Sequence, residues 1–207
     1  MLAGGMGVRL RPYTLDTPKP MVNVNGRPFV EYLIEFLKSN GIKELVLLLG
    51  YLPEKVVEHV GDGSKFGLRV KYSIGGVDDY TGTRVRNAKA LLDDTFLLLY
   101  CDNYLPMDIG KLAAFHAKKN VPATVTVYTN KDSRTKNNMF VDADGYVATY
   151  DRSRAAPGLN GVDMGFFIVK KEVVDAMPTH NFWFEEETVS RLIAEKNLAG
   201  FQVDHPY

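Results

Sequence analysis

The first residues of the chain combine glycines with cations in a pattern that suits phosphate binding. The stretch LAGGMGVRLRPYTLDTPKP places Gly4, Gly5 and Gly7 ahead of Arg9 and Lys19. Because glycine has no β-carbon, successive N–H groups can approach and wrap a phosphate chain. An arginine forks onto phosphate oxygens, and a lysine adds a more mobile point charge. The stretch therefore predicts a loop that holds a polyphosphate.

A plain glycine turn with surface cations nearby is the alternative for these residues. The spacing is not the GxGxxG of a dinucleotide site that opens directly into a helix, which disfavours a dinucleotide-dependent oxidoreductase. Pro12, Pro18 and Pro20 exclude an α-helix directly after the glycines. We therefore expect a long, ordered, cationic loop.

Composition describes an ordinary globular chain. Of the 207 residues, 45% are hydrophobic and 24% are charged, which is enough for one well-cored domain. The formal charge of zero gives no electrostatic case for nucleic acid or an anionic membrane as a partner. A single cysteine, Cys101, excludes an intramolecular disulfide framework. We find neither a signal peptide nor an apolar run of membrane-spanning length, so a cytoplasmic protein is expected.

Strand and helix patterns alternate along the chain. Helices are expected at 27–41, 53–60, 83–92, 108–120, 171–177 and 186–197. Strands are expected at 44–50, 68–74, 95–101, 123–128, 165–170 and 199–203, with a hairpin over 139–151 that turns at Asp144-Gly145. This alternation predicts an α/β fold, a Rossmann-like three-layer α/β/α domain around a mostly parallel central sheet.

Asp102 directly follows the apolar run TFLLLYC, so it is expected at the carboxyl end of a buried strand. Ligands of open α/β sheets lie beyond these strand ends, where a carboxylate offers the hard oxygen that Mg²⁺ prefers. A turn cap is the alternative reading, since aspartate is common in turns.

The opening 50 residues resemble the sugar-1-phosphate nucleotidyltransferases, also called nucleotide-sugar pyrophosphorylases. The signature of that family is G-G-x-G-x-R-L-x-P-x-T followed by P-K-P, and every element of it stands between Gly4 and Pro20. The resemblance continues through GDGSKFGLRVKYS and the strand that ends at Asp102, and more weakly to the end of the chain. We call residues 2–20 the signature loop.

The resemblance implies a reaction in which a nucleoside triphosphate and a sugar 1-phosphate give a nucleoside diphosphate sugar and pyrophosphate, with Mg²⁺. It implies catalytic roles for Arg9 on the leaving pyrophosphate, for Lys19 on the α-phosphate, and for Asp102 as the metal ligand. Such a transfer needs positioning and charge neutralisation rather than a covalent nucleophile. The nucleotide-binding residues that it implies are Leu2, Ala3, Gly4, Gly5, Gly7, Thr81 and Gly82.

Sequence cues to the base and the sugar disagree. TGTRVR resembles the TGGRLKR stretch of glucose-1-phosphate cytidylyltransferases, whereas HVGDGSKFGLRVKYS looks more like guanylyl- or uridylyltransferases. The base therefore stays open, and Arg84 and Arg86 have a solvated helix face as their alternative. For the sugar phosphate, the resemblance implies Asp151 and Arg152, with Arg154 as a rival cation, and Asp163.

The ends of the chain depart from the family pattern. A few strand residues usually precede L-A-G-G, and a second metal-binding aspartate would fall beyond Tyr207, so Asp204 is not assigned that role. We expect 1–207 to be a single nucleotidyltransferase domain that lacks a few family residues at each end. The alternative function is a non-catalytic regulatory paralogue that binds a nucleotide sugar, and homo-oligomers are left open.

Overall fold

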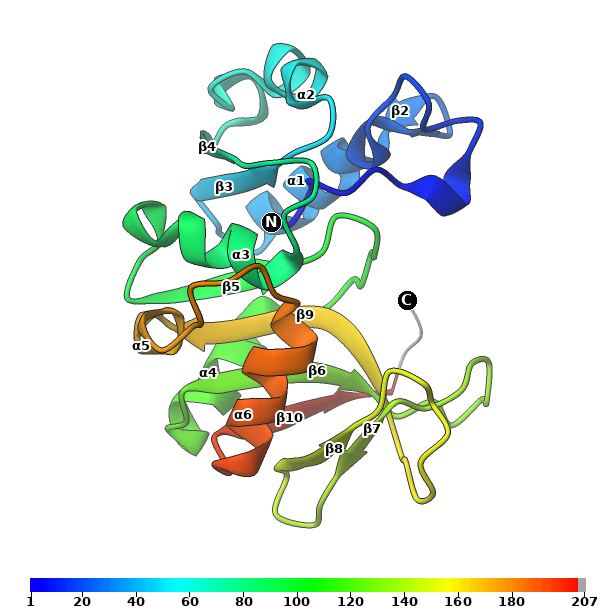
Figure 1. The fold of residues 1–207 in the computed structure, drawn as a ribbon, viewed down its shortest axis with the longest axis vertical. Coiled ribbons are helices and arrows are strands. Elements are labelled where there is room, and N and C mark those ends of the chain that lie inside the picture. The colour runs from blue at the N-terminus through cyan, green and yellow to red at the C-terminus, as the bar shows by residue number, and fades with distance from the viewer. Residues whose placement is uncertain (205–207) are drawn as a thin grey trace.

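The computed structural model describes residues 1–204 and has an α/β fold (Figure 1). Its α-helices are α1 (Phe29–Ser39), α2 (Pro53–Val60), α3 (Thr81–Asn87), α4 (Ile109–Lys119), α5 (Lys171–Asp175) and α6 (Ser190–Ala194). Its strands are β1 (Asn23–Val24), β2 (Arg27–Pro28), β3 (Glu44–Leu49), β4 (Arg69–Ile74), β5 (Thr95–Leu99), β6 (Ala123–Tyr128), β7 (Met139–Val141), β8 (Val147–Tyr150), β9 (Val162–Lys170) and β10 (Leu198–Val203). Every expected helix and strand has a counterpart, and β7 and β8 form the expected antiparallel hairpin.

The strands of the core pair in two groups. β10, β6, β9 and β5 form one sheet in that order, and β3 pairs in parallel with β4. Leu2 joins the two groups, because it makes parallel bridges to Leu48 on one side and to Tyr100 on the other. The first residues of the chain therefore lie between β3 and β5.

The expectation of a mostly parallel sheet is not confirmed, because the sheet is mixed. β9 runs antiparallel to both of its neighbours, β5 and β6, whereas β6 and β10 are parallel. The chain enters β9 from the β7–β8 hairpin rather than through a crossover helix, and parallel neighbours need such a crossover. An apolar run such as GFFIVK carries no sign of its direction.

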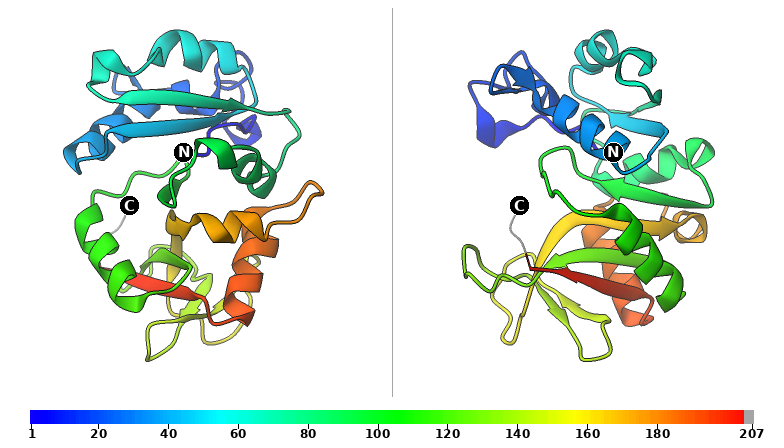
Figure 2. Two further views of the ribbon diagram at one scale, coloured as in Figure 1. Left: turned by 90° about the vertical axis from the view of Figure 1, so that its left-hand side faces the viewer. Right: turned by 180° about the vertical axis from the view of Figure 1, so that it is seen from behind.

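Helices cover both faces of the four-stranded sheet. α4 lies on one face and α6 on the other (Figures 1 and 2). All six residues of β6 are buried, as a strand covered on both faces requires. No helix within residues 1–204 has the length and apolarity needed to cross a membrane.

Two helices differ from their expected form. The expected helix over 83–92 is a short α-helix, α3, followed by a 3-10 turn over Lys89–Leu91. The expected helix over 186–197 begins as a π-helical turn, Phe184–Val189, and continues as α6. π-Helical turns are rare and often lie at functional sites.

The signature loop has the expected extended course. No α-helix follows the glycines until α1; the loop contains 3-10 turns at Val8–Leu10 and Lys19–Met21 and then the small β1–β2 hairpin. Pro20 sits inside the second turn, where it needs no backbone N–H for an α-helical bond.

Candidate nucleotide-binding site

The first residues bring the signature loop to the end of β5. The Leu2 N–H donates to the Leu99 carbonyl at 2.8 Å, and the Cys101 N–H donates to the Leu2 carbonyl at 3.0 Å. On the other side, the Ala3 N–H donates to the Leu48 carbonyl of β3 at 2.9 Å. The glycines that follow are thus placed at the same sheet edge as the residue after Cys101, which is Asp102.

Lys19 and Asp102 meet at this edge. The Lys19 ammonium and the Asp102 carboxylate form an ion pair, although the two residues are 83 positions apart in the sequence. Their side chains keep 24% and 38% of their exposure, so both remain accessible to a ligand. Two residues that the sequence predicted to share one reaction therefore lie in contact.

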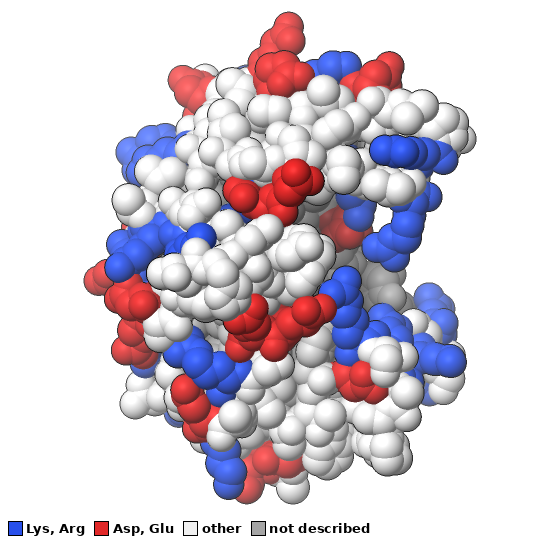
Figure 3. Space-filling model, in the orientation of Figure 1, with Lys and Arg blue, Asp and Glu red and all other residues white. Residues whose placement is uncertain are grey.

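Both residues line a cleft of about 490 Å³. Its walls comprise Leu2, Gly4, Gly5, Met6, Lys19, Val77, Asp78, Asp79, Tyr80, Thr81, Arg84, Tyr100, Cys101, Asp102, Asn181 and Trp183. Figure 3 shows basic side chains on both sides of a hollow between the upper and lower halves, on the side where Figure 1 shows the signature loop. The lining of the cleft itself contains the cations Lys19 and Arg84 and the carboxylates of Asp78, Asp79 and Asp102.

Seven of the predicted site residues stand outside the cleft lining: Ala3, Gly7, Arg9, Gly82, Asp151, Arg152 and Asp163. Ala3 is buried in its strand pairing, and Gly82 is buried inside α3. Gly7 adopts φ +62°, a conformation that glycine tolerates best, and its carbonyl accepts a 2.8 Å hydrogen bond from the Thr14 hydroxyl. Arg9 is exposed on the 3-10 turn beside Gly7.

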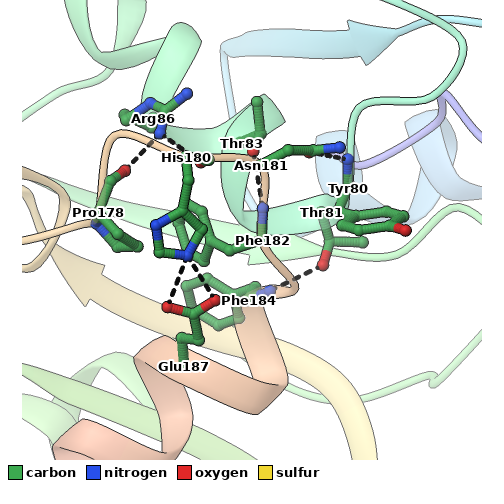
Figure 4. Close-up of polar contacts among 10 residues, drawn as sticks. All are labelled: Tyr80, Thr81, Thr83, Arg86, Pro178, His180, Asn181, Phe182, Phe184 and Glu187. Carbon is green, nitrogen blue, oxygen red and sulfur yellow. Dashed lines mark hydrogen bonds and ion pairs between the residues drawn. The ribbon is translucent and has the colours of Figure 1, made fainter.

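Opposite the signature loop, the cleft wall is formed by α3 together with residues 178–184, the 178–184 segment (Figure 4). The Gly82 N–H donates to the Phe182 carbonyl at 3.1 Å, and the Phe182 N–H donates to the Thr83 hydroxyl at 3.1 Å. The Phe184 N–H donates to the Thr81 hydroxyl at 3.0 Å. The 178–184 segment is therefore fixed along α3.

An aromatic stack on this wall was not predicted from the sequence. The rings of Tyr80 and Trp183 are stacked, with centroids 4.4 Å apart and planes 15° apart. The guanidinium of Arg152 lies 5.0 Å from the Trp183 ring centre, and it donates to Glu186 at 2.6 Å. The signal in the sequence was slight: Trp183 is the single tryptophan, placed between two phenylalanines.

An acidic cluster also went unpredicted, apart from Asp163. Glu185 accepts hydrogen bonds from the hydroxyls of Tyr100 and Thr81. Burial and the nearby Glu185 charge raise the pKa of Tyr100 well above its usual range. Burial raises the pKa of Asp163 to about 7; a hydrogen bond from the Gly165 N–H opposes this rise and the Glu185 charge adds to it. Carboxylates of this kind can accept hydrogen bonds from sugar hydroxyls.

Asp151 and its neighbours lie differently from the sequence expectation. The Asp151 carboxylate accepts hydrogen bonds from the Ser153 hydroxyl and from the N–H groups of Ser153, Ala155 and Ala156, at 2.6 to 2.8 Å. These bonds, led by the Ser153 hydroxyl, lower the pKa of Asp151 to about 2. Its carboxylate is committed to its own loop and does not line the cleft. Arg152 reaches the cleft only through Trp183.

The alternative of a solvated helix face is wrong for Arg84, whereas Arg86 is half-buried. Arg84 is only 5% exposed, and its guanidinium bonds to backbone carbonyls. Arg86 donates to the carbonyls of Pro178 and His180, the latter at 2.8 Å (Figure 4). Both arginines serve the packing of α3 rather than its solvation.

Three carboxylates line the cleft, those of Asp78, Asp79 and Asp102. Asp79 accepts a 2.9 Å hydrogen bond from the Gly76 N–H, and Asp102 lies beside Lys19. Within residues 1–204, no group of three or more His, Cys, Asp or Glu side chains is placed to hold a metal ion. Asp204 accepts from Thr129 at 2.8 Å and from Lys131 at 2.9 Å. Asp102 is accessible and beside the glycines, and Mg²⁺ commonly takes one or two carboxylates with phosphate oxygens as its other ligands. The residues present thus fit Mg²⁺ that arrives with a phosphate chain.

Comparison with known proteins identifies the family. The chain matches the Nucleotidyl transferase family over residues 1–200, and it belongs to that family. It is 31% identical to a mannose-1-phosphate guanyltransferase of Yarrowia lipolytica over 99% of this chain and 58% of that protein. It is 28% identical to a probable glucose-1-phosphate cytidylyltransferase of Bacillus subtilis over 98% of this chain and 86% of that protein. The predicted resemblance to the sugar-1-phosphate nucleotidyltransferases is confirmed.

Solved structures share the fold. HddC from Yersinia pseudotuberculosis superimposes with a TM-score of 0.81 at 22% identity, over 97% of this chain and 88% of that one. A putative glucose-1-phosphate thymidylyltransferase from Bacillus anthracis superimposes with a TM-score of 0.85 at 18% identity, over 98% and 85%. The chain spans only about 58% of the length of the Yarrowia relative.

Proposed function

We propose that the protein transfers a nucleotidyl group from a nucleoside triphosphate to a sugar 1-phosphate, giving a nucleoside diphosphate sugar and pyrophosphate, with Mg²⁺. The contact between Lys19 and Asp102 beside Gly4 and Gly5 carries this proposal. It unites a phosphate-binding cation, a metal-binding carboxylate and close-approach backbone in one cleft.

The chemistry needs no covalent intermediate. A phosphate oxygen of the sugar phosphate attacks the α-phosphorus, and the bond from that phosphorus to the bridging oxygen of the β-phosphate breaks. The electron pair leaves with pyrophosphate. Lys19 exchanges Asp102 for the α-phosphate and stabilises its developing charge, while Arg9 closes over the leaving pyrophosphate. Mg²⁺ held by Asp102 would neutralise phosphate charge when bound.

The sugar end of the proposed site involves Asp163 and Arg152. Asp163 and Glu185 border Tyr100, a cleft residue, so Asp163 is retained as a sugar-binding residue. Arg152, held over Trp183, is retained for the sugar phosphate. Asp151 stays a prediction that needs its loop to open. The relatives differ in base and sugar, and one structural neighbour, HddC, was solved as a complex with GMP-PN.

We propose one nucleotidyltransferase domain over 1–207, a cytoplasmic location, and neither nucleic acid nor membrane as a partner. A homo-oligomer stays open as well.

Pyrophosphate release tests the proposal. The chain is incubated with Mg²⁺, each of ATP, CTP, GTP, UTP and dTTP, and either glucose 1-phosphate or mannose 1-phosphate, with Lys19→Ala as the matched control. At least one pair of substrates should release pyrophosphate, and Lys19→Ala should release far less. Nucleotide binding without release from any pair would favour the regulatory alternative, and neither binding nor release would contradict both.

A further inference from the structure

The buried guanidinium of Arg84 donates hydrogen bonds to backbone carbonyls and forms no ion pair with a described carboxylate. Its guanidinium donates to the Leu49 carbonyl at 2.7 Å and the Gly76 carbonyl at 2.8 Å. It also donates to the carbonyls of Val77 at 3.2 Å and Gly4 at 3.3 Å. Burial lowers the pKa of Arg84, and the Asp79 charge opposes this effect. An unpaired buried charge is costly, so these carbonyls are what makes its burial tolerable.

The four carbonyls come from three separate segments. Gly4 belongs to the signature loop, Leu49 ends β3, and Gly76 and Val77 belong to the loop between β4 and α3. All three segments leave the sheet at the same edge, and the signature loop and the β4–α3 loop line the cleft. One planar, rigid group therefore sets the spacing between two opposing walls.

Glycines make room for this group. A β-carbon on Gly4 would lie 2.4 Å from Arg84 Cζ, and one on Gly50 would lie 2.4 Å from Arg84 Nη1. Both distances are far below contact, so a side chain at either position would displace the guanidinium from its carbonyls. Gly4 is thus explained by Arg84 as well as by a phosphate.

Arg86 provides the contrast on the same helix. It also donates to two backbone carbonyls, but those belong to Pro178 and His180, which do not line the cleft (Figure 4). Its guanidinium faces the Phe182 ring at 5.8 Å and is absent from the lining of the cleft that the described residues form. The two arginines therefore differ in which segments they hold, not in how they hold them.

We propose that Arg84 is the positioning residue of the nucleotide cleft: it fixes the signature loop against the β4–α3 loop and so preorganises the cleft for a nucleoside triphosphate. The proposal rests on the proposed function only for the identity of the ligand. It predicts that losing Arg84 weakens nucleotide binding while leaving the groups that act on the phosphates in place.

A titration followed by the fluorescence of Trp183 tests this without activity, because Trp183 is the single tryptophan and lines the cleft. Wild type, Arg84→Lys, Gly50→Ala and the control Arg86→Lys are titrated with ATP, CTP, GTP, UTP and dTTP. Lysine keeps the charge but lacks the fork, and Gly50→Ala displaces the guanidinium without removing it. For the preferred nucleotide, Kd should rise on the order of tenfold in Arg84→Lys and Gly50→Ala, as the loss of charged hydrogen bonds implies. Arg86→Lys should stay within about twofold.

Kinetics then separates positioning from general loosening. In Arg84→Lys, KM for the triphosphate should rise with Kd, while kcat at saturation stays within about threefold, because catalytic contacts made in the transition state persist. Folded Arg84 variants that bind the nucleotide as wild type does would overturn the inference, and so would equal weakening in Arg86→Lys. Failure of both Arg84→Lys and Gly50→Ala to fold would make Arg84 a folding determinant and overturn it too. Wild type that binds none of the five nucleotides would instead contradict the proposed function.

Discussion

The signature loop and the α3 junction, which comprises α3 and the 178–184 segment, form opposite walls of one cleft and are built in opposite ways. The signature loop exposes large apolar side chains, with Tyr13 73% and Leu15 57% exposed. In α3, Gly82, Thr83 and Arg84 are buried and bonded to distant backbone. Groups that must engage and release a ligand lie on the open loop, whereas groups that hold the walls apart are buried.

Of the substitutions considered, loss of the Lys19 charge on the signature loop should lower turnover most. We expect Lys19→Ala to lower kcat by roughly a hundredfold or more, as removal of one preorganised electrostatic contact typically does. Its thermal unfolding should stay close to wild type, because the Lys19–Asp102 pair is accessible and such pairs add little stability. Steady-state kinetics and a melting curve check both parts. Near-normal turnover would remove Lys19 from the chemistry.

Asp102→Asn sharpens the same point for the metal. Asparagine keeps the shape but loses the charge, so we expect Mg²⁺-dependent nucleotide binding to vanish while metal-free binding persists. Calorimetry with and without Mg²⁺ measures the difference. If Mg²⁺-dependent binding is unchanged in Asp102→Asn, Asp102 is not a metal ligand and serves as a turn cap.

Two glycine substitutions compare the walls directly. A β-carbon on Gly82 would lie 2.2 Å from Phe182, which is 1% exposed, whereas one on Gly5 would meet no described atom within 4 Å. Gly82→Ala gains helix propensity of about 1 kcal/mol, but overpacking a fully buried ring costs about 1–3 kcal/mol. We expect Gly82→Ala to lower the melting temperature, and Gly5→Ala to leave it unchanged while weakening nucleotide binding. Melting curves and nucleotide titrations measure the two effects. A lower melting temperature in Gly5→Ala with an unchanged one in Gly82→Ala would contradict the comparison.

The aromatic stack gives a smaller effect. Removing the ring under Arg152 forfeits a cation–π contact of about 0.5–2 kcal/mol. Trp183→Leu should therefore raise KM for the sugar 1-phosphate by about threefold to tenfold. Trp183→Phe, the matched control, keeps a ring and should lose less. A rise in KM for the triphosphate alone would place Arg152 away from the sugar phosphate.

Two carboxylates should respond to pH with opposite signs. The pKa of Asp163 is raised from 3.8 to about 7, so the folded protein holds a proton that the unfolded chain releases, and its contribution to stability is lost as pH rises through that window. Asp163→Asn should thus gain stability over wild type between pH 4 and pH 7. The pKa of Asp151 is lowered to about 2, so the Asp151 carboxylate stabilises the fold above pH 4 and loses this effect as pH falls toward 2. Asp151→Asn should therefore be less stable than wild type above pH 4, and the difference should shrink as pH falls below 4. Chemical denaturation across pH measures both.

The sequence placed Lys19 and Asp102 in one predicted site, and the structure has them in contact, whereas the contacts of the α3 junction were not predicted. Lys19 and Asp102 belong to patterns that chemistry imposes on local sequence: a glycine-rich cationic loop and a carboxylate after a buried strand. Arg84 donates to the carbonyls of Gly4, Leu49 and Gly76. Because every residue has a backbone carbonyl, the sequence does not show which residues will accept such bonds. The direction of β9 was equally hidden, because burial pattern is the same for either direction.

A crystal structure of the protein with its preferred nucleoside triphosphate tests the central claim most directly. The account predicts phosphate density within hydrogen-bonding distance of the N–H groups at Gly4 to Gly7, with Lys19 moved from Asp102 to a phosphate oxygen and the base against the loop that precedes α3. Nucleotide bound on another loop, with the Lys19–Asp102 pair intact and the signature loop unchanged, would contradict it.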